Sequence, residues 1–313
     1  MISETTMTPK KIIPLIVTLS LLGFLVWNIL QNLPLLSSIR WHFSFLDLLI
    51  LILFLLPIHF INGYSWHIIV KSIGGKVRLF EDLKVWVFSS LSRLIPGGLW
   101  QYPARVLLLS KNGPSKTVAS EAVIIDALMN LYIGSFIVLI SIFWIKLTII
   151  ETFGKLVLVI SLILTFLVVI FASSRMLTKL VNLYTKTTGR NITVTNLKVK
   201  YLPLICLLFF GQFFFSGMVL FYLSRGFVDL NLANIPLFVS IFTISWLIGF
   251  LSLFAPGGLG VQEISIATLL STSVHISFPL ASLIAVLFRI LLYICEFFTL
   301  LVFIVLKEKF RKN

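Results

Sequence analysis

The sequence predicts an all-α, polytopic membrane protein that forms one integral membrane domain over residues 1–313. We expect about six full spans and two re-entrant hairpins of broken helices, arranged as an inverted repeat. Apolar residues make up 59% of the chain and charged residues only 12%, whereas soluble domains have about 45–50% and about 25%. A water-soluble fold could not cover so much apolar surface. The composition therefore excludes a soluble enzyme domain, a disordered chain and a nucleic-acid binder with a folded basic face.

Apolar stretches long enough to cross a bilayer, about 20 residues each, follow one another along the chain. We predict full spans over residues 12–31, 45–63, 117–145, 155–173, 201–223 and 279–306. Lys10 and Lys11 precede the first stretch, as basic residues precede a signal peptide, but no cleavage site of small residues follows, so we expect a retained helix. Cys206 and Cys295 lie within predicted spans and are expected to pack as small apolar side chains.

Two further apolar stretches, 85–110 and 236–273, are each interrupted by Pro-Gly-Gly. The sequence Pro-Gly-Gly-Leu beginning at Pro96 recurs at Pro256. Proline removes a backbone donor and glycine weakens a helix, so we expect both helices to break at these points. In lipid, such a break is tolerated only where it is buried in protein or lines a cavity.

Basic residues collect on one side of the predicted topology, in the segments 10–11, 71–84, 111–116, 175–200 and 307–312. Because cytoplasmic loops carry an excess of Lys and Arg, we expect this side to face the cytoplasm. Both termini would then be cytoplasmic, in the plasma membrane of a prokaryote. The first broken segment would enter and leave from the cytoplasm and the second from outside, although 236–255 is long enough to cross completely.

The order of elements predicts an internal repeat with halves of about 1–150 and 151–313. Each half would contain two spans, a broken hairpin and a third span. Three crossings is an odd number, so the second half would lie upside down relative to the first. Inverted repeats whose broken helices meet near the midplane are typical of secondary transporters.

Charges at membrane depth and helices that restart after a break together predict a substrate-binding pocket. A restarting helix exposes free amides and the positive end of its dipole, which bind anionic groups, and a charge inside the membrane is costly. The predicted substrate-binding residues are Arg93, Pro96, Gly97, Gly98, Arg105, Asp126, Pro256, Gly257, Gly258, Gly260, Glu263, Arg289 and Glu296.

Several of these residues have alternative interpretations. Glu263 could stabilise the start of its own helix, pair with Arg289 or contact a headgroup. Arg93 and Arg105 could extend to the cytoplasmic interface, and the two breaks could be kinks that only serve packing.

Other polar features indicate less. His59 is eight residues before His67, a spacing that could suit a metal or a proton relay, but interfacial or packing roles are favoured. No catalytic residue, metal site or cofactor is predicted, because the sequence has no nucleotide-binding, metalloprotease or nucleophile-elbow motif.

The two broken segments resemble the lysylphosphatidylglycerol synthase transmembrane-region family, the flippase-like domain of the multiple peptide resistance factor. The first match is the stretch from Ile95 to Gln101 followed by Arg105, and the second is the Pro-Gly-Gly-Leu-Gly-Val-Gln-Glu stretch that ends at Glu263. In this family Arg289 and Asp126 fall where members often have an arginine and an acid.

The resemblance implies a flippase-like protein that translocates an anionic phospholipid or lipid-linked headgroup, with membrane lipids and a lipid-modifying transferase as partners. No soluble aminoacyl-transfer domain follows the last span, so we expect that the chain is not itself a synthase. Two alternatives are open. One is an integral-membrane transferase acting on a lipid phosphate or a polyprenyl-linked sugar, with Asp126 or Glu263 as general base. The other is a non-catalytic partner of such an enzyme.

Overall fold

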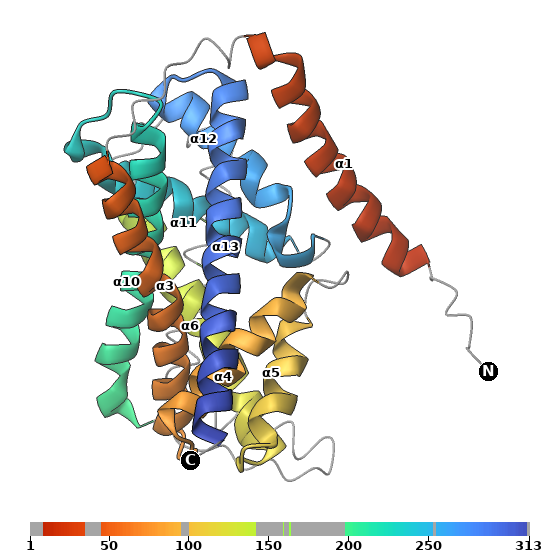
Figure 1. The fold of residues 1–313 in the computed structure, drawn as a ribbon, viewed down its shortest axis with the longest axis vertical. Coiled ribbons are helices and arrows are strands. Elements are labelled where there is room, and N and C mark those ends of the chain that lie inside the picture. The colour runs from red at the N-terminus through yellow and green to blue at the C-terminus, as the bar shows by residue number, and fades with distance from the viewer. Residues whose placement is uncertain are drawn as a thin grey trace.

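The computed structural model describes residues 9–34, 45–94, 100–141, 198–252 and 255–311, together with 159 and 163 (Figure 1). Over these residues the chain is helical and forms no strand. The helices are α1 (Pro9–Gln31), α3 (Phe45–Ser72), α4 (Leu79–Ser90), α5 (Gln101–Ser110), α6 (Lys116–Ser141), α10 (Leu202–Arg225), α11 (Ile235–Leu251), α12 (Val261–Val274) and α13 (Phe278–Arg311). The predicted all-α class is confirmed.

Within the described residues, five helical segments are long and apolar enough to cross a membrane. Four of them, in α3, α6, α10 and α13, coincide with predicted spans. The fifth is 232–251, which includes α11. The predicted span 12–31 forms α1, which has 23 residues. Apart from residues 159 and 163, the predicted span 155–173 lies outside the described residues.

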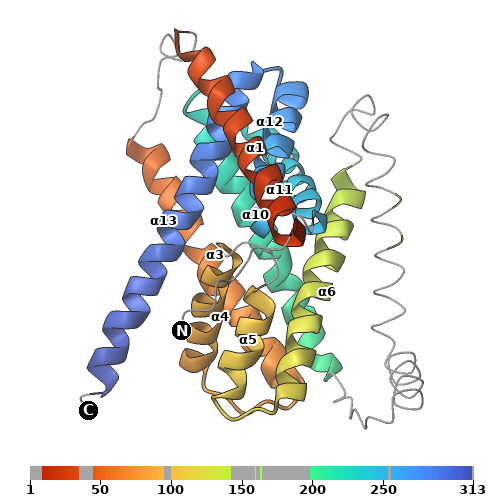
Figure 2. The same ribbon diagram turned by 90° about the vertical axis from the view of Figure 1, so that its right-hand side faces the viewer.

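Two helical hairpins enter the molecule from opposite ends. Helices α4 and α5 pack together, as do α11 and α12, and Figure 1 shows the first pair in the lower half and the second in the upper half. Their tips meet half-way, where the short 3-10 turns η1 (Leu91–Leu94) and η5 (Pro256–Gly258) are in contact. Figure 2 shows the same arrangement from the side. The placement of these hairpins as re-entrant in a bilayer stays a prediction, since 232–251 has spanning length.

The long helices flanking the two hairpins run in opposite directions. In Figure 1, α3 descends and α10 ascends, while α6 ascends and α13 descends. Each hairpin therefore follows one long helix and precedes another. This is the order that a repeat requires, and the duplication itself stays a prediction.

Helix α10 forms the centre of the packing. Its side chains Phe209, Phe213 and Phe221 are almost completely buried. Gly217 allows α11 to approach closely, because a Cβ atom there would lie only 2.4 Å from the Cα of Val239. This close crossing positions α10 and α11 on one wall of the cavity described below.

The outer surface of the bundle is apolar. Phe45, Leu53, Phe298 and Val305 are each more than 60% exposed. Exposed apolar side chains on helices of spanning length are what contact with lipid requires. The protein is therefore a membrane protein by surface as well as by composition.

Basic segments far apart in the sequence lie at the same end of the molecule. The backbone amide of Lys198 donates to the carbonyl of Ser72 at 3.1 Å, which joins the start of the α10 region to the end of α3. The start of α6 and the end of α13 lie at this end too (Figure 1). The assignment of this end to the cytoplasm stays a prediction.

Candidate substrate-binding site

A cavity of about 210 Å³ lies between the two hairpins. Its walls are contributed by both hairpins and by α3, α6, α10 and α13. Six of the predicted site residues line it: Arg93, Arg105, Asp126, Gly257, Gly258 and Arg289. Residues far apart in the sequence therefore line one cavity, and their role in binding a substrate stays a prediction.

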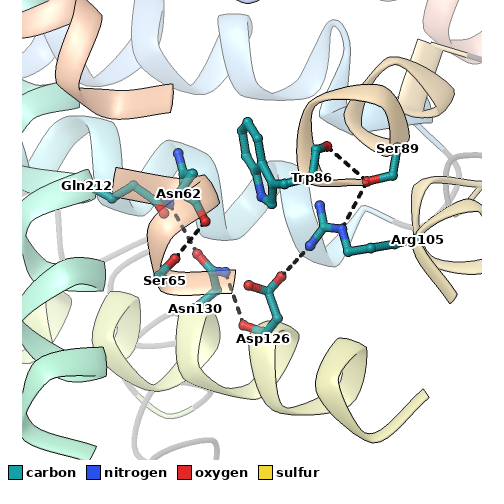
Figure 3. A network of polar contacts seen from close by, with 8 residues as sticks. All are labelled: Asn62, Ser65, Trp86, Ser89, Arg105, Asp126, Asn130 and Gln212. Atoms are coloured by element: carbon teal, nitrogen blue, oxygen red, sulfur yellow. Dashed lines mark hydrogen bonds and ion pairs between the residues drawn. The ribbon is translucent and has the colours of Figure 1, made fainter. Parts of the chain in front are cut away.

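One wall of this cavity contains the ion pair formed by Arg105 of α5 and Asp126 of α6 (Figure 3). Arg105 Nη1 donates to Asp126 Oδ2 at 2.8 Å, and its Nε donates to the Ser89 hydroxyl at 3.1 Å. The guanidinium lies over the ring of Trp66, 5.0 Å from its centroid. Because Arg105 is only 4% exposed, it does not extend to the surface but is held inside by a carboxylate and an aromatic ring.

Arg93 holds the tip of the first hairpin against α13. Its Nη2 donates to Glu296, which also accepts a hydrogen bond from the Ser90 hydroxyl. Glu296 is 3% exposed, whereas the Arg93 side chain is partly exposed. The Nε atom of Arg93 is buried and has no acceptor among the described residues. Arg93 also lies beside Gly257 of the opposite tip, where an added Cβ would be 3.6 Å from the Arg93 carbonyl oxygen.

Glu263 holds the second hairpin in two ways at once. One carboxylate oxygen accepts from Arg289 Nε, and the other accepts from the backbone amide of Gly260 at 2.7 Å. Both interpretations of Glu263, as a helix cap and as the partner of Arg289, are thus correct. The amide of Gly260 is used by the chain itself, which differs from the expectation that it is free for a ligand. Arg289 Nη2 is buried and has no partner among the described residues.

A family model described as the lysylphosphatidylglycerol synthase TM region matches residues 11–300. The chain belongs to this family. No curated protein matches the chain. The match confirms the resemblance inferred from the two Pro-Gly-Gly segments, and it identifies a membrane protein of the type associated with lipid-headgroup flippases and synthases.

In this member of the lysylphosphatidylglycerol synthase TM region family, the predicted site residues other than these six lie elsewhere in the protein or outside the described residues. Glu263 and Glu296 bind the guanidinium groups that line the cavity rather than lining it themselves. Pro256 begins the turn η5 at the second tip. The first Pro-Gly-Gly, residues 96–98, lies outside the described residues. Gly257, Gly258 and Gly260 have positive φ angles of 59°, 70° and 82°, which favour glycine.

Several residues that line the cavity were not predicted as site residues from the sequence. His59 is 6% exposed, lines the cavity, and has no hydrogen-bond partner for either ring nitrogen among the described residues. The amides of Asn62 and Gln212 and the indole of Trp246 line it as well. An amide inside an apolar stretch was a usable signal, because a polar side chain at that depth needs a partner.

The cavity contains a chain of amide hydrogen bonds, visible in Figure 3. Gln212 Nε2 donates to Asn130 Oδ1 at 3.1 Å, and Asn130 Nδ2 donates to the backbone carbonyl of Asp126 at 3.1 Å. At the other end of this series of hydrogen bonds, the side-chain oxygen of Gln212, Oε1, is buried and has no donor among the described residues. The polar wall therefore ends in an open hydrogen-bond acceptor.

His67 lies on another contact, between α3 and α4. Its Nδ1 is 2.6 Å from Asp82 Oδ2. Asp82 is fully buried, and burial raises its pKa from 3.8 to about 6, an effect that the hydrogen bond from His67 partly opposes. The two histidines that the sequence grouped therefore have separate environments.

Proposed function

We propose that this protein translocates an anionic phospholipid or lipid-linked headgroup across the bilayer, and that the cavity receives the phosphate while the acyl chains stay in lipid. The observation that carries the proposal is the set of arginines at the meeting of the two hairpins, two of which keep a buried N–H group without an acceptor among the described residues. A guanidinium has five N–H groups in a planar fork that matches phosphate oxygens. Buried polar groups without a partner call for an explanation, and an absent ligand supplies one.

The charge balance of the cavity supports transport. Each cavity arginine is bonded to a carboxylate, in the pairs Arg93–Glu296, Arg105–Asp126 and Arg289–Glu263. Such pairing lowers the cost of keeping a charge at membrane depth before a ligand arrives. The leftover donors then bind an anion weakly enough to release it, which a translocation pathway requires.

The proposed membrane placement follows from the two hairpins and the basic end. We place the hairpin tips near the midplane, with the pair α4–α5 entering from the cytoplasm and α11–α12 from outside. The basic end would face the cytoplasm of a prokaryotic cell, with both termini on that side. The opposed directions of the flanking helices support the inverted repeat in which this placement is expected.

The transferase alternative has less support. A general base needs a carboxylate that can take up a proton. Asp126 and Glu263 each accept a hydrogen bond from an arginine, and Glu263 also accepts one from the backbone amide of Gly260, so both carboxylates are already bound by the protein itself. The arrangement therefore favours binding over proton abstraction.

Translocation of a fluorescent phosphatidylglycerol in proteoliposomes tests the proposal. The double variant Arg93→Gln/Glu296→Gln removes one cation and its partner together, so that no buried charge is left unpaired. We expect at least a tenfold lower rate, and a similar loss for Glu263→Gln/Arg289→Gln. Arg225→Gln, at the exposed end of α10, is the matched control and should keep the wild-type rate. If both double variants insert normally and move lipid at the wild-type rate, the assignment of the site is wrong.

A further inference from the structure

We propose that the cavity has two chemically different subsites, and that its amide subsite, formed by Asn62, Asn130 and Gln212, binds the neutral, hydroxyl-bearing part of the headgroup. The arginine subsite would hold the phosphate. This inference rests on the proposed function and names its substrate class: a phosphate-bearing lipid whose outer headgroup is an uncharged polyol, such as a glycerol or a sugar.

The open acceptor of Gln212 is the first support. Gln212 is 8% exposed, its Nε2 is bonded to Asn130, and its Oε1 has no donor among the described residues. The bond to Asn130 fixes the orientation of the amide, so the free oxygen is held in place rather than free to rotate. A buried carbonyl of this kind needs an O–H or N–H donor. A hydroxyl group on a ligand would satisfy it.

The aromatic side chains beside the amides are the second support. Trp246, Phe242 and Phe250 line the same cavity. Trp246 is held rigidly, edge to face against Phe213 at 5.2 Å and stacked on Phe250 at 5.1 Å. Ligand sites combine such apolar walls with a few fixed polar groups that orient the ligand. A polyol has both the C–H surface and the hydroxyls that this combination fits.

The charges of the cavity favour a neutral hydroxyl over an ammonium group as this donor. Asp126 is the one carboxylate among the described residues that line the cavity, and it accepts a hydrogen bond from Arg105. An ammonium that bound Asp126 would compete with the arginine for this acid, and displacing the arginine would leave a buried guanidinium without its partner. Such a loss is strongly unfavourable. A neutral hydroxyl can use Gln212 and Asn130 without disturbing the ion pair.

Binding of short-chain lipids to the purified full chain in detergent, measured by isothermal titration calorimetry, tests this inference. Dihexanoyl phosphatidylglycerol and phosphatidylinositol carry hydroxyls, whereas dihexanoyl phosphatidylethanol has the same phosphodiester charge without them. Phosphatidylethanolamine supplies the ammonium. We expect the hydroxylated lipids to bind about tenfold more tightly than phosphatidylethanol, and phosphatidylethanolamine to gain nothing, because one or two neutral hydrogen bonds are worth about that factor.

Gln212→Leu should lower the affinity for the hydroxylated lipids about five- to tenfold and leave that for phosphatidylethanol unchanged. Gln31→Leu, which removes an exposed amide from α1, is the matched control. Asn62→Leu removes a cavity amide from α3 and serves as the second variant if Gln212→Leu does not fold.

Two results would overturn the inference: equal affinity for phosphatidylethanol and phosphatidylglycerol, or tightest binding of phosphatidylethanolamine. Either result would leave the arginine subsite and the translocation proposal intact. A hydroxyl preference that depends on Gln212, combined with unaltered translocation in the arginine double variants, would instead support the amide subsite while refuting the proposed function.

Discussion

Each hairpin forms ion pairs with the long helices, but the charges that the two hairpins contribute to these pairs have opposite signs. In the first, both cations, Arg93 and Arg105, belong to the hairpin and their acids belong to the long helices α13 and α6. In the second, the acid Glu263 belongs to the hairpin and its cation, Arg289, belongs to α13. The two ends of the cavity are therefore alike in topology and reversed in charge.

This difference indicates that the second hairpin is held by its own acid, whereas the first presents its positive charges to the cavity. Glu263 satisfies the start of its own helix as well as Arg289, and three glycines with positive φ shape the turn before it. Helix α5, by contrast, begins after Trp100 with no side-chain cap and no acid in its first turn. We infer that the second hairpin is locked by its own acid, while the first offers donors to a ligand.

The largest effect is expected at Glu263, where cap and ion pair coincide. Glu263→Ala leaves Arg289 buried without its acid, which costs about 3–5 kcal/mol, and removes the cap at Gly260, worth about 1 kcal/mol. Glu263→Gln keeps an oxygen for the cap and should lose only the first part. Thermal unfolding in detergent measures both. Equal stability of the two variants would show that the cap contributes nothing.

Double substitution of the ion pair Arg105–Asp126 should destabilise the protein less than either single substitution does. Arg105→Met or Asp126→Leu alone leaves a buried charge unpaired and should cost about 3–5 kcal/mol. The double variant Arg105→Met/Asp126→Leu replaces both charges with apolar groups of similar volume and should recover most of this loss. Unfolding of the four proteins, wild type included, gives the coupling energy. Additive losses would contradict the pairing.

The turn of the second hairpin allows a smaller but well-controlled test. Gly258→Ala places a side chain on a residue with φ 70°, and its Cβ would lie 3.0 Å from the Cα of Gly249. We expect a loss of about 2–3 kcal/mol from strain and crowding together. Gly74→Ala is the control, because Gly74 has φ 86° but nothing within 4 Å of an added Cβ, so it should lose only the strain of about 1–2 kcal/mol. Equal losses would contradict the close packing of the tip on α11.

The contact that joins α3 to the first hairpin predicts a pH dependence. The pKa of Asp82 is raised from 3.8 to about 6, so the native state holds this proton more tightly than the unfolded state does. Stability contributed by Asp82 is therefore complete below about pH 4 and is lost as the pH rises through about 6. Asp82→Asn does not titrate, and it should gain up to about 2–3 kcal/mol on the wild type between pH 4.5 and 7.5.

His67 and Glu81 are the titratable neighbours of Asp82. Repeating the comparison in a His67→Gln background tests Asp82 without the histidine that bonds it. A difference between wild type and Asp82→Asn that does not change with pH would contradict the raised pKa.

Much of the architecture could be predicted because it depends on local properties of the chain. Apolar stretches of the right length predicted α3, α6, α10 and α13, and the second Pro-Gly-Gly predicted the break between α11 and α12. Asp126 and Asn130 are four residues apart, a spacing that places them on one helix face, and the structure joins them through the Asp126 carbonyl. The family resemblance came from the same broken segments.

The sequence could not predict in this way which residues form the ion pairs, or which amides bond to one another in the cavity. Arg93 and Glu296 are 203 residues apart and Gln212 and Asn130 are 82 residues apart, so no local spacing indicates that they meet. His59 and Gln212 look like isolated polar residues in apolar stretches, and only the packing of α3 and α10 turns them toward the cavity.

The sequence by itself determined that the chain belongs in a membrane, where α11 and α12 are separated by a break, and which charges fall within apolar segments. These properties follow from hydrophobic length and from the chemistry of proline, glycine and charge, which act within a few residues. Only the tertiary structure decided that the tips of the two hairpins touch, that each of the three cavity arginines has its own acid, and that the amides share one cavity. Such choices depend on which helix faces pack together, and packing is a property of the whole bundle rather than of any one segment.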